Sequence, residues 1–313
     1  MIISASRRTD IPAFYARWFM RRIAEGFVVV RNPRNARQFR RIELTPEGVA
    51  ALIFWTRNSA PLAAGLRELD VLGYRYLFHY TITGYPRVLE PHVPELSQAI
   101  RQFCALSEQI GPSRLAWRYD PILFSNMTPP DEQLHRFAAI ARQLAGQTQR
   151  VVISLCDLYT KSCRNLDTIP GLIYQDPGAR PGELAPFLRA LAEIAQRHGM
   201  TIHSCAEPQD FSALGIAPGK CIDEQWLEAE FGLQLAGRKD PGQRPACRCI
   251  PSVDIGQYHS CLHGCLYCYA TGSLAAARQQ QLRHDPDSPL LIGPASDVPA
   301  ALLQPPGRQA SLF

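Results

Sequence analysis

The stretch RVVISLCDLYTK, residues 150–161, carries the pattern that decides the fold: an apolar run rich in β-branched residues, followed at once by polar side chains. A short run of this kind predicts a buried strand. Six similar runs lie in the first 205 residues: IISAS (2–6), FVVVR (27–31), ALIFWT (51–56), YRYLFHYTIT (74–83), RLAWRY (114–119) and MTIHSC (200–205).

Segments with helical periodicity lie between these runs. Residues 12–26, 94–111, 131–146 and 183–199 have apolar side chains three and four positions apart and a glycine near the end. Apolar strands that alternate with amphipathic helices predict a parallel sheet covered by helices. Seven or more such units favour a TIM-like (β/α) barrel, full or partial, over a doubly wound open sheet. A nucleotide-binding form of that open sheet lacks support, since no GxGxxG follows the first strand.

Composition changes along the chain and predicts three parts. Residues 1–205 form the barrel core, and residues 206–283 form a cysteine-rich, cluster-binding segment packed on the barrel mouth. Residues 284–313 are rich in proline and without periodicity, so we expect a loosely ordered tail.

The overall composition excludes several classes of protein. With 313 residues, of which 46% are hydrophobic, the chain can bury a sizeable core. Its net charge of +5 is too small to indicate nucleic-acid binding by itself. No apolar run is long enough to span a membrane and no signal peptide is evident, which predicts a cytoplasmic protein. In such a protein, ten cysteines indicate metal binding or redox chemistry more than disulfides.

Polar residues follow the predicted strands, at the end of a barrel where active sites are built. Arginine recurs among them, and its forked donors suit carboxylate or phosphate oxygens. We therefore expect an anionic small-molecule or nucleotide substrate, with nucleic acid as a further option. Asp120 and Glu207 would orient the arginines or act as acid and base. The strand-end residues are Arg7, Arg8, Asp10, Arg31, Asn32, Trp55, Arg57, Asn58, His79, Tyr80, Thr81, Thr83, Arg118, Tyr119, Asp120, Asp157, Lys161, Cys205 and Glu207.

The segment SCLHGCLYCYA, residues 260–270 and here termed the cysteine loop, holds Cys261, Cys265 and Cys268 in the spacing C-x3-C-x2-C. Such a segment can bind three irons of a [4Fe-4S] cluster and leave the fourth iron open. Zinc is the competing metal, because His259 and His263 flank the motif.

A second cysteine group consists of Cys205, Cys221, Cys247 and Cys249. These four residues could hold a second cluster or a structural zinc ion, or one of them could complete the first cluster. The remaining cysteines, Cys104, Cys156 and Cys163, are expected to be ordinary buried residues.

The cysteine loop resembles the radical S-adenosylmethionine superfamily, in which three cysteines with this spacing bind a [4Fe-4S] cluster and S-adenosylmethionine binds the open iron. Tyr267 matches that superfamily's aromatic residue before the last cysteine. Together with SRRTDIP, RYDP, SCAE, KCID and CRCIPSVDIG, the loop also resembles the domain of unknown function 1848 family, up to about residue 275. The resemblance implies two cofactors, a [4Fe-4S] cluster and S-adenosylmethionine. It also implies an electron donor such as ferredoxin or flavodoxin as a partner.

The loop lies at the C-terminal end of the chain, whereas in that superfamily it follows the first strand. Circular permutation accounts for this, because the first and last units of a barrel are neighbours. The permutation predicts that Arg7, Arg8 and Asp10 face the cysteine loop, where SASRRTD would replace the superfamily's glycine-rich GGE-like segment. Arg57, Asn58 and Tyr267 complete the expected cofactor-binding set, and Arg118, Asp120, Lys161 and Glu207 are the expected catalytic residues.

The resemblance implies radical chemistry on the anionic substrate, and two other functions stay open. One is a non-radical enzyme with a structural cluster or zinc, in which Asp120, Glu207 and His79 carry out acid–base or hydrolytic chemistry. The other is a redox sensor that binds nucleotides or nucleic acid, whose binding would weaken steeply with salt.

Overall fold

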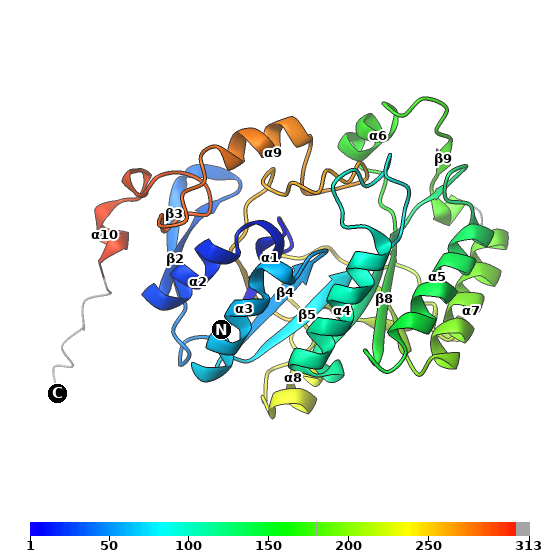
Figure 1. Cartoon of the computed structure of the whole chain (residues 1–313), viewed down its shortest axis with the longest axis horizontal. Helices are drawn as coiled ribbons and strands as arrows, with labels where there is room; N and C mark the ends of the chain where they lie inside the picture. The colour runs from blue at the N-terminus through cyan, green and yellow to red at the C-terminus, as the bar shows by residue number, and fades with distance from the viewer. Residues whose placement is uncertain (180, 305–313) are drawn as a thin grey trace.

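A central parallel sheet with helices on its faces organises the molecule (Figure 1). The computed structural model describes residues 1–179 and 181–304. The eight strands lie in the order β11-β10-β8-β6-β5-β4-β1-β12. They are β1 (Ile2–Ala5), β4 (Ala51–Thr56), β5 (Tyr76–Thr81), β6 (Leu115–Ile122), β8 (Arg150–Leu155), β10 (Thr201–Cys205), β11 (Ala217–Gly219) and β12 (Val253–Asp254).

Helices follow most of these strands and cover the sheet, as the alternating pattern predicts. In Figure 1, α3, α4 and α5 lie in front of the strands, and α5 packs on α7. The helix expected over residues 12–26 is two helices, separated at Tyr15. The helices are α1 (Ile11–Phe14), α2 (Ala16–Glu25), α3 (Ala60–Val71), α4 (Leu96–Ile110), α5 (Pro130–Leu144), α6 (Thr160–Leu166), α7 (Pro181–Arg197), α8 (Glu224–Phe231), α9 (Leu274–Gln281) and α10 (Ala300–Leu303).

All seven predicted runs form strands, and six of them lie in the central sheet; the expectation that the seventh also belongs to this sheet is wrong. The run FVVVR forms β2 (Phe27–Asn32), which pairs antiparallel with β3 (Asn35–Glu43) in a separate hairpin. Residues 35–38 of β3 are exposed, so the hairpin has one face in contact with solvent. Figure 1 shows it beside α2 and α10 at the left of the view. A second short pair joins β7 (Phe124–Ser125) to β9 (Tyr174–Gln175).

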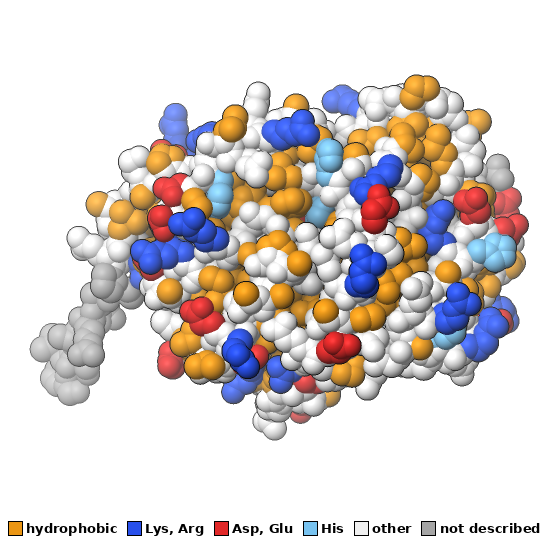
Figure 2. Space-filling view, viewed as in Figure 1, with side chains coloured by type: hydrophobic (Ala, Val, Ile, Leu, Met, Phe, Trp, Pro, Cys, Tyr) orange, Lys and Arg blue, Asp and Glu red, His pale blue; other side chains and the backbone are white. Residues whose placement is uncertain are grey.

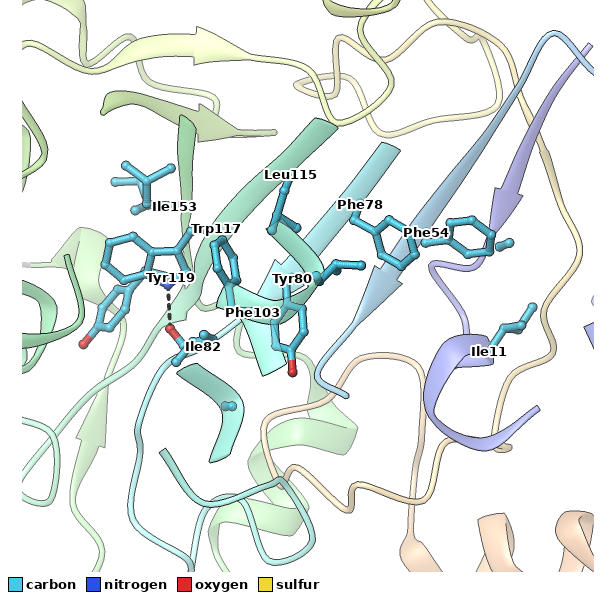
Figure 3. Packing of buried hydrophobic residues seen from close by; sticks show 14 of the residues in the cluster. Ile11, Phe54, Phe78, Tyr80, Ile82, Phe103, Leu115, Trp117, Tyr119 and Ile153 are labelled. Atoms are coloured by element: carbon cyan, nitrogen blue, oxygen red, sulfur yellow. Dashed lines mark hydrogen bonds between the residues drawn. The ribbon is translucent and has the colours of Figure 1, made fainter. Parts of the chain in front are cut away.

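The main core lies between the sheet and the helices and is rich in aromatic side chains (Figure 3). Phe54 and Phe78, from the neighbouring strands β4 and β5, stack with 4.7 Å between ring centroids. Trp117 on β6 is fully buried, and its indole Nε1 donates to Ile82 O at 2.9 Å. Because the buried polar atom of this ring has a partner, its burial costs little.

Two short strands from the cysteine-rich segment are the edge strands of the sheet. At one end β11 pairs with β10, and at the other β12 pairs with β1 in parallel, with Ile3 opposite Val253 and Ser4 opposite Asp254. The cysteine loop follows β12 directly, so the chain segment that carries it starts beside the N-terminal strand. This neighbourhood agrees with the one that circular permutation predicts.

Residues 284–304 differ from the loosely ordered segment expected from their prolines. Trp18 Nε1 on α2 donates to Ser288 O at 3.0 Å, and Leu290 and Val298 pack on Val29 of the hairpin. The rest of the predicted tail, 305–313, lies outside the described residues. Across the described part of the chain, no helix combines the length and the apolar composition that a membrane span needs.

Candidate functional site at the cysteine loop

Both cysteine groups predicted from the sequence line one cavity of about 510 Å³. The cavity lies at the carboxyl ends of the parallel strands, where the loops after each strand meet. Its lining includes Arg7, Arg8, Asp10, Trp55, Arg57, Thr81, Arg118, Asp120, Asp157, Cys205, Cys221, Arg244, Cys247, Cys249, Tyr258, Cys261, His263, Cys265, Tyr267 and Cys268. Arginine is the most frequent charged residue in this set, as the strand-end pattern indicates.

The cysteine loop has no regular secondary structure and is held by hydrogen bonds to distant segments. These involve the residue between α1 and α2, the coil between β5 and α4, and α6. They are Tyr15 Oη to Ser260 O (2.6 Å), Leu266 N to Leu89 O (3.0 Å) and Ser162 Oγ to Tyr267 O (3.2 Å). Contacts on several sides fix the backbone that presents the three thiols.

The donor set of the loop fits an iron–sulfur cluster with three protein ligands. Cys261, Cys265 and Cys268 are free thiols that line the same cavity, and cysteine sulfur is the usual ligand of such clusters. Ala270 N donates to Cys268 Sγ at 3.3 Å, a type of contact that tunes cluster potential. Burial raises the pKa of Cys261, and it raises the pKa of Cys265 to about 12. Both thiols therefore stay protonated until a metal displaces the proton.

Asp10 connects the loop after β1 to the cysteine loop. Its Oδ2 lies 2.8 Å from His263 Nε2 and accepts from Arg57 N at 2.7 Å, while Oδ1 accepts from Ala13 N and Thr56 Oγ1. The bond from Ala13 N makes Asp10 the N-cap of α1. Asp10 is buried, so its carboxylate is committed to holding three segments together.

Arg57 and Tyr267 belong to a second buried network behind the loop. Arg57 donates to Glu90 Oε1 at 3.0 Å and to Tyr267 Oη at 2.6 Å, and Tyr267 Oη itself donates to Glu90. Burial would lower the pKa of Arg57, but the negative charge of Glu90 raises it well above its ordinary value. Arg57 and Tyr267, both expected to bind a cofactor, thus hold the part of the loop between Cys265 and Cys268 in place.

Arg7 and Arg8 line the same cavity as the cysteine loop. Arg7 Nη2 donates to Ser252 Oγ at 3.2 Å, and its guanidinium lies 5.9 Å from the centre of the Trp55 ring. Each of the two arginines has its Nε 3.9 Å from an Asp254 oxygen, a long contact for an ion pair. Arg8 lies over the ring of Tyr258, and Tyr269 Oη donates to Arg7 O at 2.6 Å. Their positive charges are the ones best placed to bind an anion in the cavity.

Arg118 and Asp120 line the cavity beside the second cysteine group. Arg118 donates through Nε and Nη2 to Asp120 Oδ2 at 2.9 and 2.6 Å, and through Nη1 to Cys221 Sγ at 3.0 Å. Ser154 Oγ also donates to Asp120. The guanidinium of Arg118 is therefore fully used within the protein.

Other predicted site residues lie outside the set that lines the cavity. Glu207 accepts from Leu155 N at 2.8 Å, and burial raises its pKa to about 7. His79 is fully buried, with its Nε2 2.7 Å from Cys221 O.

Asn58 accepts from Ala60 N at the start of α3, and Arg31 and Asn32 belong to the hairpin. Lys161 Nζ lies 5.9 Å from the centre of the Tyr258 ring.

Sequence reasoning missed Asp254, Glu90 and Arg244. Asp254 on β12 accepts from Ser4 Oγ at 2.7 Å and from Arg7 N at 2.9 Å, which ties the two strands together. Arg244 lines the cavity and pairs with Asp157. The sequence DIG, which starts at the last residue of β12, was the one local signal, because an acidic residue at a strand end resembles the other strand-end residues.

A close approach at Gly256 explains how the segment fits beside β1. A Cβ added there would lie 1.9 Å from Ser6 Oγ and 2.6 Å from Ser6 Cβ. Only glycine leaves room for the backbone at this point.

Comparison with known proteins gives one family. The model of the family described as Domain of unknown function (DUF1848) matches residues 2–270, which include both cysteine groups and every predicted site residue. Neither the curated proteins nor the solved structures contain a match.

Proposed function

The chain belongs to the family described as Domain of unknown function (DUF1848), and from its site we propose an iron–sulfur enzyme of the radical S-adenosylmethionine type that acts on an anionic substrate. The observation that carries the proposal is the shared cavity. Its lining includes three free thiols in C-x3-C-x2-C spacing together with Arg7 and Arg8.

The roles of the chain's own residues follow from these contacts. Cys261, Cys265 and Cys268 would hold a [4Fe-4S] cluster, which when bound can supply single electrons to S-adenosylmethionine. Arg7 and Arg8 would bind carboxylate or phosphate oxygens of the substrate or of the methionine moiety. Asp254 lies near both arginines, with the Nε of each 3.9 Å from one of its carboxylate oxygens.

We also propose that the sheet is a partial (β/α) barrel. Read as a ring, the strand order follows the order of the chain, and the ring is open between β11 and β12. A doubly wound sheet would instead reverse its order at the first strand. The parallel pairing of β12 with β1 supports the permuted arrangement, in which the C-terminal unit lies next to the N-terminal one.

The contacts favour this proposal over acid–base chemistry without a radical. Asp120 lines the cavity, but Arg118 and Ser154 occupy its oxygens, and His79 is not part of the lining. The face in Figure 2 also gives little support to a nucleic-acid sensor, because Lys and Arg are scattered there among acidic side chains.

Anaerobic reconstitution tests the proposal. Full-length protein with iron and sulfide, supplied with S-adenosylmethionine and either dithionite or reduced flavodoxin, should release 5′-deoxyadenosine. The variant Cys265→Ser should not, whereas Cys104→Ser on α4 should behave as the unmodified protein does. A protein that carries the cluster but forms no 5′-deoxyadenosine with either electron source would contradict the proposal.

A further inference from the structure

The second cysteine group brings four thiols from three separate segments to the lining of one cavity. Cys205 ends β10, Cys221 follows β11, and Cys247 and Cys249 lie in the coil after α8. The sulfur atoms of Cys205 and Cys221 are 3.0 Å apart. The thiols of Cys221, Cys247 and Cys249 are also close enough to shift one another's pKa. All four residues are free cysteines.

Hydrogen-bond donors point at the sulfur atoms of this group. Arg118 Nη1 lies 3.0 Å from Cys221 Sγ, and Ile222 N donates to Cys249 Sγ at 3.4 Å. Donors of this kind stabilise thiolates, and a guanidinium offsets part of the negative charge of a tetrathiolate site. A group of neutral thiols would gain little from a buried arginine aimed at one sulfur.

We propose that Cys205, Cys221, Cys247 and Cys249 bind one tetrahedral divalent ion of zinc chemistry, at a site separate from the cysteine loop. This inference goes beyond the proposed radical activity and does not depend on it. The ion would tie β10, β11 and the coil after α8 together at the open edge of the sheet.

The spacing of the sulfurs favours a single ion over a second iron–sulfur cluster. Four thiolates around one zinc ion are about 3.8 Å apart, from a bond of about 2.3 Å and tetrahedral angles. The ligands of a [4Fe-4S] cluster bind different irons, so their sulfurs are farther apart. In the described residues, no three His, Cys, Asp or Glu side chains already surround a common point as they would a bound ion. The four thiols would therefore have to move when the ion binds. Cys205 and Cys221, now 3.0 Å apart, would have to separate by less than 1 Å.

Metal analysis of the full chain, purified anaerobically and loaded with iron and sulfide, tests the site. We expect about one zinc ion per chain in addition to the iron. Cys249→Ser should lose the zinc and keep the iron, while Cys261→Ser should lose iron and keep the zinc. Cys104→Ser is the matched control and should keep both.

A second measurement needs no variant and so does not depend on how Cys249→Ser folds. Exchange of zinc for Co2+ in the unmodified protein should produce the absorption bands of tetrahedral cobalt with thiolate ligands. Three results would overturn the proposal: no zinc in the unmodified protein, loss of iron and sulfide in Cys249→Ser, or a disulfide between Cys205 and Cys221 in the anaerobic protein by mass spectrometry.

Discussion

His263 in the cysteine loop lies 2.8 Å, Nε2 to Oδ2, from Asp10 in the loop after β1, although 253 positions separate them in the chain. The same carboxylate caps α1 and accepts from the end of β4. One buried side chain therefore holds together the three segments that form the wall of the cavity around the cysteine loop.

Asp10→Ala should lower the free energy of unfolding by about 3 kcal/mol, because it removes a helix cap and leaves buried donors without acceptors. Urea unfolding under anaerobic conditions measures the change. Asp131→Ala, at an exposed position in the first turn of α5, is the control and should cost about 0.5 kcal/mol. Equal losses in the two variants would show that the Asp10 contacts contribute nothing specific.

Glu90→Gln should destabilise the protein by about 3 kcal/mol, because it leaves the charge of Arg57 buried without its partner. The exposed pair of Arg87 and Glu95 lies nearby and supplies the comparison. Glu95→Gln should change the free energy of unfolding by about 0.5 kcal/mol or less, because solvent screens that pair. A small effect at Glu90 would contradict the buried network.

Gly256→Ala should lower stability by about 2 kcal/mol, since the new methyl group would collide with Ser6 and push β12 away from β1. The thermal unfolding midpoint reports the loss. Gly182→Ala, where a Cβ meets nothing within 4 Å, should leave the midpoint unchanged or slightly raised. If both glycines tolerate alanine, the close approach at Gly256 is not a constraint.

Iron content should depend on the cysteine loop alone. Serine at Cys261, Cys265 or Cys268 should each remove most of the iron from the reconstituted protein, because each thiolate would hold a different iron. Cys163→Ser on α6 should retain the full amount. If iron persists in all three loop variants, the cysteine loop is not the site of the cluster.

Local patterns predicted much of the fold because the buried strands are continuous apolar runs. ALIFWT and RVVISLC became β4 and β8 at nearly the predicted bounds. FVVVR has the same local pattern, and only its pairing with the charged strand β3 separates it from the central sheet. β11 and β12 have three and two residues, which is too short for any periodicity.

The site was partly predictable for a related reason. The cysteine spacing and the strand-end arginines are local signals, so they could be found in the sequence. Glu90 lies in an irregular coil, and its partners Arg57 and Tyr267 are 33 and 177 positions away. Contacts of this kind depend on how the loops meet in space, which no local pattern records. The packing of residues 284–304 was missed likewise, because Leu290 finds its partners on the distant hairpin.

The pairing of β12 with β1 has a consequence for the growing chain on the ribosome. β1 is apolar, yet the partner for one of its edges does not exist until residue 254 has been synthesised. Until then the nascent protein exposes an unpaired apolar edge, the kind of surface on which chains aggregate. Completion of the sheet and assembly of the cysteine loop are thus events of the same late stage, and binding of the proposed cluster would follow them.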